Sequence, residues 1–132
     1  MINREFDSLT KLDHPLIAEL LEVYLDQNFV YFVSPFYTGG EIHDLMFNLT
    51  DKKSNDSFIK PTPLSEEQIK PIIYQILRAL NYLKNNNLIH RDLKPENVML
   101  ESYRAFNDEK STFIKIIDFG YSLDLNADMS DS

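Results

Sequence analysis

The strongest hydrophobic pattern in the chain runs from residue 65 to residue 83. Large aliphatic side chains recur there every three or four residues, as on one side of an α-helix: Ile69, Ile72, Ile73, Ile76, Leu77, Leu80 and Leu83. Ser65 with Gln68 three residues later is a capping-box pattern that begins a helix, and Asn85-Asn86-Asn87 ends it. Pro71 conflicts locally, because it lacks a backbone N–H. The spacing predicts one long helix whose apolar side is core.

Shorter apolar runs on either side of this helix predict strands. Ile17–Leu25 and Phe29–Ser34 are joined by the turn residues Asp26-Gln27-Asn28, which is the pattern of a hairpin. Val98-Met99-Leu100 and Phe113–Ile117 are predicted as two further short strands, with a polar excursion between them.

Polarity and helix-breaking residues define the other segments. Arg4–Leu12 is predicted as the end of a helix, and Glu41–Phe47, after two glycines, as a short helix. Residues 48–63 are polar and predict a surface loop longer than most connections. From Tyr121 onward the chain is acidic and small, which predicts a mobile tail without a packing pattern.

Composition narrows the class of protein. The 132 residues are 43% hydrophobic and contain no cysteine, which indicates one soluble unit without disulfides, a zinc–cysteine cluster or a thiol nucleophile. No apolar run approaches the roughly 18 residues of a membrane span, so a cytoplasmic or nuclear location is expected, with no membrane partner. The net charge of −8 argues against nucleic-acid binding. It is compatible with basic peptide substrates, although a solubilising acidic surface explains it more simply.

Two motifs carry the candidate chemistry. The run His90-Arg91-Asp92-Leu93-Lys94-Pro95-Glu96-Asn97 is followed, after the two further short strands, by Asp118-Phe119-Gly120. In this pattern one Asp accepts a hydroxyl proton, while the Asn and the second Asp hold magnesium through oxygen atoms. On these residues the chain resembles a eukaryotic protein kinase of the serine/threonine type.

The resemblance implies a role for each motif residue. Asp92 would be the catalytic base that orients a substrate hydroxyl, and Lys94 would neutralise charge on the transferred phosphoryl group. Asn97 and Asp118 would bind Mg²⁺. Arg91 would pair with a phosphate or carboxylate of the activation segment.

Upstream residues resemble the nucleotide-binding part of a kinase. Residues 30–41 are similar to the fifth strand and the hinge, so the backbone groups of Pro35 and Tyr37 would meet the adenine of ATP, and Met99 would form its floor. Ser34 falls at the gatekeeper position. Pro35 replaces the usual acidic residue but keeps the carbonyl that would be read there.

Three glutamates extend the resemblance. Glu5 matches the helix glutamate that pairs with a strand lysine in kinases. Glu41 would lie near the ribose, and Glu41 with Glu96 matches the acidic pair that selects basic residues upstream of the phosphorylated Ser or Thr. The regulatory spine of stacked residues is matched by Leu9, Leu20, His90 and Phe119.

The fold implied by the resemblance is α+β, a truncated protein-kinase-like fold with the end of the N-lobe and the first part of the helical C-lobe. Residues 1–34 would be the remainder of the N-lobe, 35–41 the hinge, and 42–132 the first part of the C-lobe up to the start of the activation segment. The 132 residues hold no G-x-G-x-x-G-x-V run, V-A-I-K lysine or A-P-E anchor. In kinases the long helix packs partly on later helices, so some of its apolar stripe is expected to face water.

Among kinases, the motifs look most like the calcium/calmodulin-dependent and calcium-dependent group. No D-x-D-x-D-G calcium loop is present, so calcium control is not predicted for these residues. The implied reaction is transfer of the γ-phosphoryl group of ATP to a protein Ser or Thr, with Mg²⁺. The alternative is a catalytically inactive kinase-like binding or scaffold protein.

Overall fold

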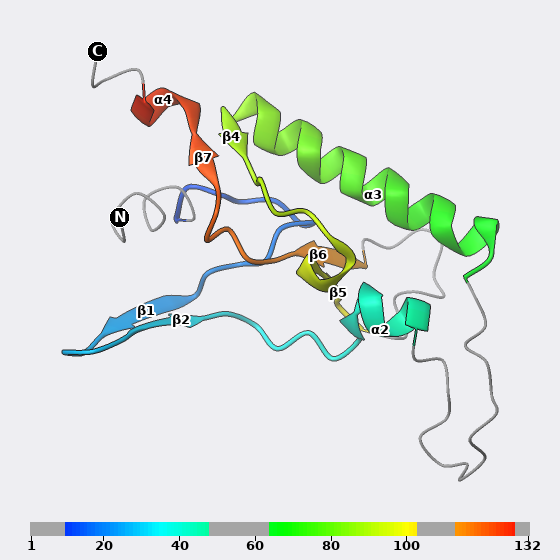
Figure 1. Ribbon diagram of the computed structural model, residues 1–132, viewed down its shortest axis with the longest axis horizontal. Helices are drawn as coiled ribbons and strands as arrows, with labels where there is room; N and C mark the ends of the chain where they lie inside the picture. The colour runs from blue at the N-terminus through cyan, green and yellow to red at the C-terminus, as the bar shows by residue number, and fades with distance from the viewer. Residues whose placement is uncertain (1–9, 48–63, 103–112, 129–132) are drawn as a thin grey trace, which may run out of the picture.

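A computed structural model describes residues 10–47, 64–102 and 113–128. These residues form small antiparallel sheets beside one long helix (Figure 1). In chain order the elements are β1 Glu22–Leu25, β2 Val30–Val33, β3 Gly40–Glu41, α2 Ile42–Phe47, α3 Glu66–Asn85, β4 Leu88–Ile89, the 3₁₀ turn η1 Pro95–Asn97, β5 Val98–Leu100, β6 Ile114–Ile116, β7 Leu123–Asp124 and α4 Leu125–Asp128. The α+β expectation is confirmed.

The predicted capping box at the start of α3 is present. The Ser65 hydroxyl accepts the Gln68 N–H at 3.3 Å, and the Gln68 side-chain oxygen accepts the Ser65 N–H at 2.9 Å. At the other end the helix stops at Asn85, and Asn87 takes a left-handed φ of 56°, a conformation that asparagine tolerates well. Pro71 lies inside the helix without ending it.

The apolar stripe of α3 divides into two faces. Ile72 and Leu83 are buried against β6 and β4, together with Gln75 and Ala79. The apolar stripe is wider than the part of the helix that these strands cover, so the residues along its other edge are exposed to solvent. These residues are Ile69, Ile73 and Leu77, which are 38%, 48% and 59% exposed. Part of the stripe therefore faces water, as the kinase resemblance implies, and the simpler prediction of an entirely buried stripe is wrong at these three residues.

The core lies between α3 and the β5–β6 pair. The register pairs Val98 with Ile116 and Leu100 with Ile114, and all four side chains are buried. The predicted first strand is interrupted: Ile17 makes a parallel bridge to Ile116, with hydrogen bonds from Ala18 N–H to Ile116 O and from Ile116 N–H to Leu16 O, both 2.9 Å. β6 thus joins the segment before β1 to the central sheet.

The predicted hairpin forms as β1 and β2, with Glu22 opposite Val33 and Leu25 opposite Val30. Asp26 closes its turn, because one carboxylate oxygen accepts the N–H groups of Asn28 and Phe29, each at 2.7 Å. The hairpin extends away from α3 (Figure 1).

The predicted tail without a packing pattern is wrong for residues 121–128. β7 pairs with β4, with Leu88 opposite Asp124 and Ile89 opposite Leu123. The Leu125 N–H donates to Asn87 O at 2.9 Å. These contacts use backbone groups, which a hydrophobic pattern does not reveal.

Some predictions lie outside the described residues. They are the part of the first helix up to residue 9, which includes Glu5 and Leu9, and the loop 48–63. The short helix predicted at 41–47 is confirmed as α2. Among the residues that are described, no helix combines the length and apolarity needed to cross a membrane.

Candidate active site

The two motifs predicted to carry the chemistry lie side by side. One follows β4 and contains η1, and the other follows β6. The Asn97 carbonyl accepts the Ile117 N–H at 3.0 Å, which joins the end of η1 to the residue before Asp118. Arg91 and Asp118 have φ values of 66° and 59°. Such conformations are strained for residues other than glycine, and they cluster at functional sites.

A buried histidine connects the motifs. His90 is 3% exposed; its Nδ1 accepts the Asp92 N–H at 3.2 Å, and its Nε2 lies 2.9 Å from the Ile117 carbonyl oxygen. Nδ1 accepts a hydrogen bond, and the Ile117 carbonyl oxygen can only accept one. The neutral ring therefore carries its hydrogen on Nε2, and this N–H donates a hydrogen bond to the Ile117 carbonyl. The ring also meets Phe119 edge-on, with centroids 4.8 Å apart. Of the predicted spine, His90 and Phe119 are thus in contact.

The carboxylate of Asp92 contacts two other residues of its motif, Asn97 and Lys94. The Asn97 amide nitrogen donates to the Asp92 carbonyl at 2.9 Å and to its Oδ2 at 3.1 Å. Lys94 Nζ lies 3.1 Å from the same Oδ2. The hydrogen bond to Asp92 is the largest cause that raises the pKa of Lys94, and the negative charge of Asp92 is the second. The Lys94 ammonium therefore remains protonated.

Asp118 lies next to this cluster. Its side chain is exposed, and one oxygen accepts the Gly120 N–H at 3.2 Å. Its charge is also among the smaller causes that raise the pKa of Lys94, after the hydrogen bond and charge of Asp92. The two residues predicted to bind magnesium, Asn97 and Asp118, therefore lie near the pair formed by the Asp92 carboxylate and the Lys94 ammonium.

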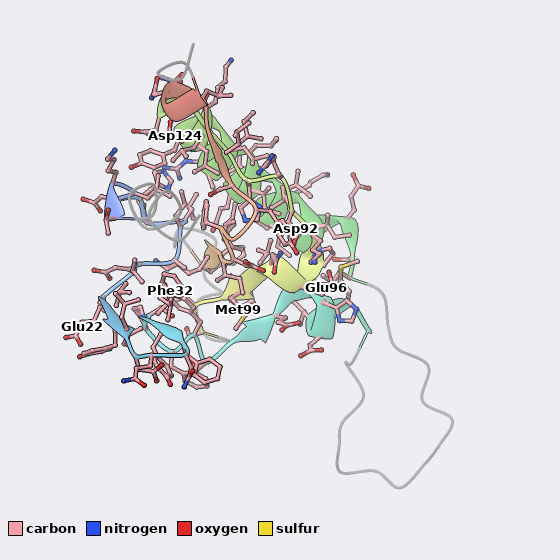
Figure 2. All side chains as sticks on the ribbon, turned by 60° about the vertical axis from the view of Figure 1, so that its left-hand side comes forward. Glu22, Phe32, Asp92, Glu96, Met99 and Asp124 are labelled. Atoms are coloured by element: carbon pink, nitrogen blue, oxygen red, sulfur yellow. The ribbon has the colours of Figure 1, made fainter. Side chains whose placement is uncertain are left out.

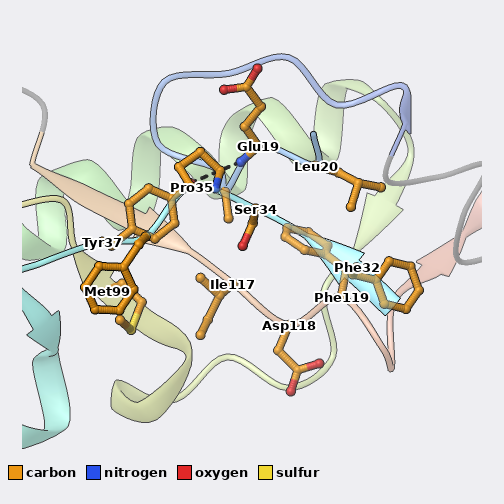
Figure 3. Close-up of a pocket in the computed structure, with 12 residues that line it drawn as sticks. Glu19, Leu20, Phe32, Ser34, Pro35, Tyr37, Met99, Ile117, Asp118 and Phe119 are labelled. Atoms are coloured by element: carbon orange, nitrogen blue, oxygen red, sulfur yellow. Dashed lines mark hydrogen bonds between the residues drawn. The ribbon is translucent and has the colours of Figure 1, made fainter. Parts of the chain in front are cut away.

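A cavity of about 370 Å³ opens beside Asp118 (Figure 3). Three residues predicted to contact adenine line it, namely Pro35, Tyr37 and Met99, and the predicted gatekeeper Ser34 lines it too. The Tyr37 hydroxyl accepts the Glu19 N–H at 3.2 Å, and burial raises its pKa. Further lining residues are Ala18, Glu19, Leu20, Phe32, Phe36, Ile117 and Phe119.

Of these, Ala18, Glu19, Phe32, Phe36 and Ile117 were not selected from the sequence. They belong to segments whose order of apolar and polar residues is that of an ordinary short strand, so the pattern does not mark them as lining a cavity. Their only signal was their position next to the residues of the kinase pattern.

Glu41 does not line this cavity. It lies at the end of β3, and a ligand atom of Glu41 and those of His43 and Asp44 are within 4.8 Å of one another. His43 Nε2 is 4.0 Å from Glu96 Oε1, so the two predicted substrate-binding glutamates lie in one surface region. In Figure 2 Asp92, Glu96 and Met99 are labelled near one another in the middle of the view.

Comparison with known proteins agrees with these motifs. Residues 1–131 match the protein kinase domain family, and the chain belongs to that family. The chain is 40% identical over 119 residues to calcium-dependent protein kinase 4 of Plasmodium falciparum, covering 90% of this chain and 20% of that protein. It is 37% identical over 119 residues to calcium-dependent protein kinase 6 of Plasmodium berghei, covering 90% and 7%.

A third relative, calcium-dependent protein kinase 3 of Plasmodium yoelii yoelii, is 34% identical over 123 residues, which are 93% of this chain and 20% of that protein. The chain thus spans a fifth or less of the length of these relatives.

Proposed function

We propose that this protein transfers the γ-phosphoryl group of ATP to Ser or Thr hydroxyls of proteins, with Mg²⁺ as the metal. The observation that carries the proposal is the joining of two motifs: Asp92 is held by Asn97 and Lys94, and His90 ties that loop to the backbone before Asp118. Phosphoryl transfer depends mainly on positioning and charge stabilisation, and this arrangement supplies both.

The cavity fits the base of a nucleotide. Its volume of about 370 Å³ is within the ordinary range of ligand sites, and much of its lining is apolar. Met99 provides a flat apolar contact, while the backbone groups of Pro35 and Tyr37 offer a polar edge. Asp118 lies at the side from which phosphates would extend.

The side chains of Asn97 and Asp118 fit Mg²⁺. Both offer hard oxygen atoms, which this ion prefers. Since the Asn97 amide nitrogen bonds to Asp92, the amide oxygen is the atom of Asn97 suited to a cation. When bound, Mg²⁺ neutralises phosphate charge.

Asp92 would accept the proton of the substrate hydroxyl. Its Oδ2 is oriented by Asn97 and Lys94, and its backbone is fixed by His90. Lys94 would place a positive charge beside the oxygen atoms of the transferred group. Ser or Thr substrates with basic residues upstream would meet Glu41 and Glu96, and the net charge of −8 is compatible with such a preference. We further propose a cytoplasmic location.

The second candidate is a kinase-like binding or scaffold protein without catalysis. The 132 residues contain neither the glycine-rich run nor the V-A-I-K lysine. Since those groups normally hold the phosphates, we expect the 132-residue chain by itself to transfer little phosphate.

Labelled ATP, Mg²⁺ and a basic Ser/Thr peptide, added to the full gene product, test the proposal. Asp92→Asn should lower transfer by about a hundredfold or more, the range of general base catalysis, while nucleotide still binds. Asp118→Ala should weaken Mg²⁺-dependent nucleotide binding. Asp13→Asn, which removes an exposed carboxylate away from the site, is the matched control. Nucleotide binding without transfer by the parent would support the scaffold, and equal transfer by Asp92→Asn would overturn the role of Asp92.

A further inference from the structure

Lys115 lies at the centre of β6, directly opposite Met99 on β5. Side chains of directly opposed residues project from the same face of a sheet. Met99 lines the cavity and Lys115 does not, so Lys115 lies beside the cavity lining on the face of the sheet that bears Met99. Its side chain is only 16% exposed, which is low for a residue that usually extends its charge into water.

The ammonium of Lys115 contacts three separate parts of the chain. Nζ donates to the Pro15 carbonyl at 2.6 Å, lies 4.0 Å from Glu101 Oε1, and lies 5.9 Å from the centre of the Tyr37 ring. The first contact is a charge-assisted hydrogen bond, the stronger kind. The last is within the range of a cation–π interaction.

These contacts converge on the cavity wall. Pro15 precedes Ala18 and Glu19, which line the cavity, and the Glu19 N–H is bonded to the Tyr37 hydroxyl (Figure 3). The Lys115 ammonium thus contacts the segment that leads to Glu19 and also the ring of Tyr37, whose hydroxyl is hydrogen-bonded to Glu19. Among the described residues, the backbone hydrogen bonds between that segment and β6 are those of Leu16 and Ala18 with Ile116.

We infer that Lys115 is a positioning residue for nucleotide binding, which holds the Pro15 segment and Tyr37 against β6 and so sets the width of the cavity. This inference rests on the proposed function. Without the ammonium, the Pro15 carbonyl loses its donor and the Tyr37 ring loses the charge beneath it. The wall that bears Glu19 and Tyr37 can then move relative to Met99. Asp92 and its partners lie outside these contacts.

The test compares Lys115→Met, which keeps the length of the side chain without its charge, with Lys115→Arg, which keeps the charge. Lys70→Met is the matched control, since Lys70 is exposed on α3 and its ammonium pairs with Glu66 one turn earlier. In the full gene product, KM for ATP and kcat are measured, together with equilibrium binding of a fluorescent ATP analogue and the melting temperature.

Lys115→Met should raise KM for ATP and weaken analogue binding about tenfold, as expected for loss of a charge-assisted contact, with kcat changed less than about twofold. Lys115→Arg should restore most of the affinity, and Lys70→Met should match the parent. Were Lys115→Met to unfold, Tyr37→Leu, which keeps the backbone groups but removes the ring, should show the same rise in KM.

Unchanged affinity in Lys115→Met, or in Tyr37→Leu if the former does not fold, would overturn the inference while leaving the proposed function intact. A lowered melting temperature with unchanged KM would do the same, because it would show a structural role only. A parent that binds no nucleotide would contradict the proposed function, and the inference with it.

Discussion

The region from β4 to Phe119 and the β1–β2 hairpin differ in how their side chains are used. In the former, Val98, Ile116 and Phe119 are buried, and the buried polar residues His90 and Asn97 bond to neighbouring backbone or side-chain groups. In the hairpin most large apolar side chains face water. Examples are Tyr24 at 56%, Leu25 at 72%, Phe29 at 64% and Phe32 at 44% exposure.

This difference separates a preorganised part of the molecule from one that lacks partners in the described residues. The proposed catalytic residues follow β4, which packs on α3, and η1 packs against α2 and β3 and is bonded to Ile117. The hairpin is held mainly by its own ladder and turn. An isolated two-stranded hairpin is only marginally stable in water. The outer face of α3 resembles the hairpin in this respect, because its apolar residues are also uncovered.

Two neighbours on α3 give the largest expected difference. Ile72→Ala removes a side chain that is 4% exposed and should lower the free energy of unfolding by about 2–5 kcal/mol. Ile73→Ala changes a side chain that is 48% exposed and should cost less than about 1 kcal/mol. Urea unfolding of both variants measures the difference. Equal losses would mean that the outer face of α3 is covered in the folded protein.

Gln75 gives the next largest effect. Its side-chain oxygen accepts the N–H groups of Phe113 and Ile114 at 3.0 and 3.2 Å, where β6 begins. Gln75→Leu leaves both buried donors without this acceptor and should cost about 1–3 kcal/mol in urea unfolding. Asn81→Leu, on an exposed position of the same helix, should stay within about 0.5 kcal/mol of the parent. A neutral Gln75→Leu would show that β6 is fixed without α3.

Acid should affect the hairpin through Asp26, with the smallest effect. Hydrogen bonds from the Asn28 N–H and then from Tyr31 and Phe29 lower the pKa of Asp26 below 3.8. The unfolded hairpin therefore binds a proton more readily, so the contribution of Asp26 is complete above pH 3.8 and is lost as the pH falls through the folded-state pKa. NMR signals of Phe29 should report loosening of the hairpin as the pH falls below 3.8. Asp26→Asn, which keeps an oxygen acceptor but does not titrate, should lack this step.

Local patterns predicted the elements whose causes are local. The capping box of Ser65 and Gln68, the turn at Asp26 and the strand pair at Val98–Leu100 each depend on a few adjacent residues, and each is present. The motifs around Asp92 and Asp118 also specified the family, which the comparison confirms.

Features that depend on distant partners could not be predicted in this way. The pairing of β7 with β4 uses backbone groups of a segment that looked unstructured. The buried role of Gln75 and the contacts of Lys115 join residues 38 and 100 positions apart, to Phe113 and Pro15 respectively. Neither side chain interrupts the local hydrophobic pattern, so periodicity gives no sign of them. The roles of Asp92, Lys94 and Asn97 in catalysis stay predictions, as do those of Pro35, Tyr37, Glu41, Met99, Asp118 and Glu5 in binding.

Binding of Mn²⁺ with ATP tests the central claim most directly. Mn²⁺ prefers the same oxygen donors as Mg²⁺ and broadens the NMR signals of nearby nuclei, so it reports where the metal–nucleotide complex lies. We predict that the amide signals of Asn97 and Gly120 broaden first, that the hairpin signals of Asn28 stay sharp, and that Asp118→Ala removes the effect. Broadening first at Glu41, His43 and Asp44, the other group of metal-binding side chains in the described residues, would contradict it.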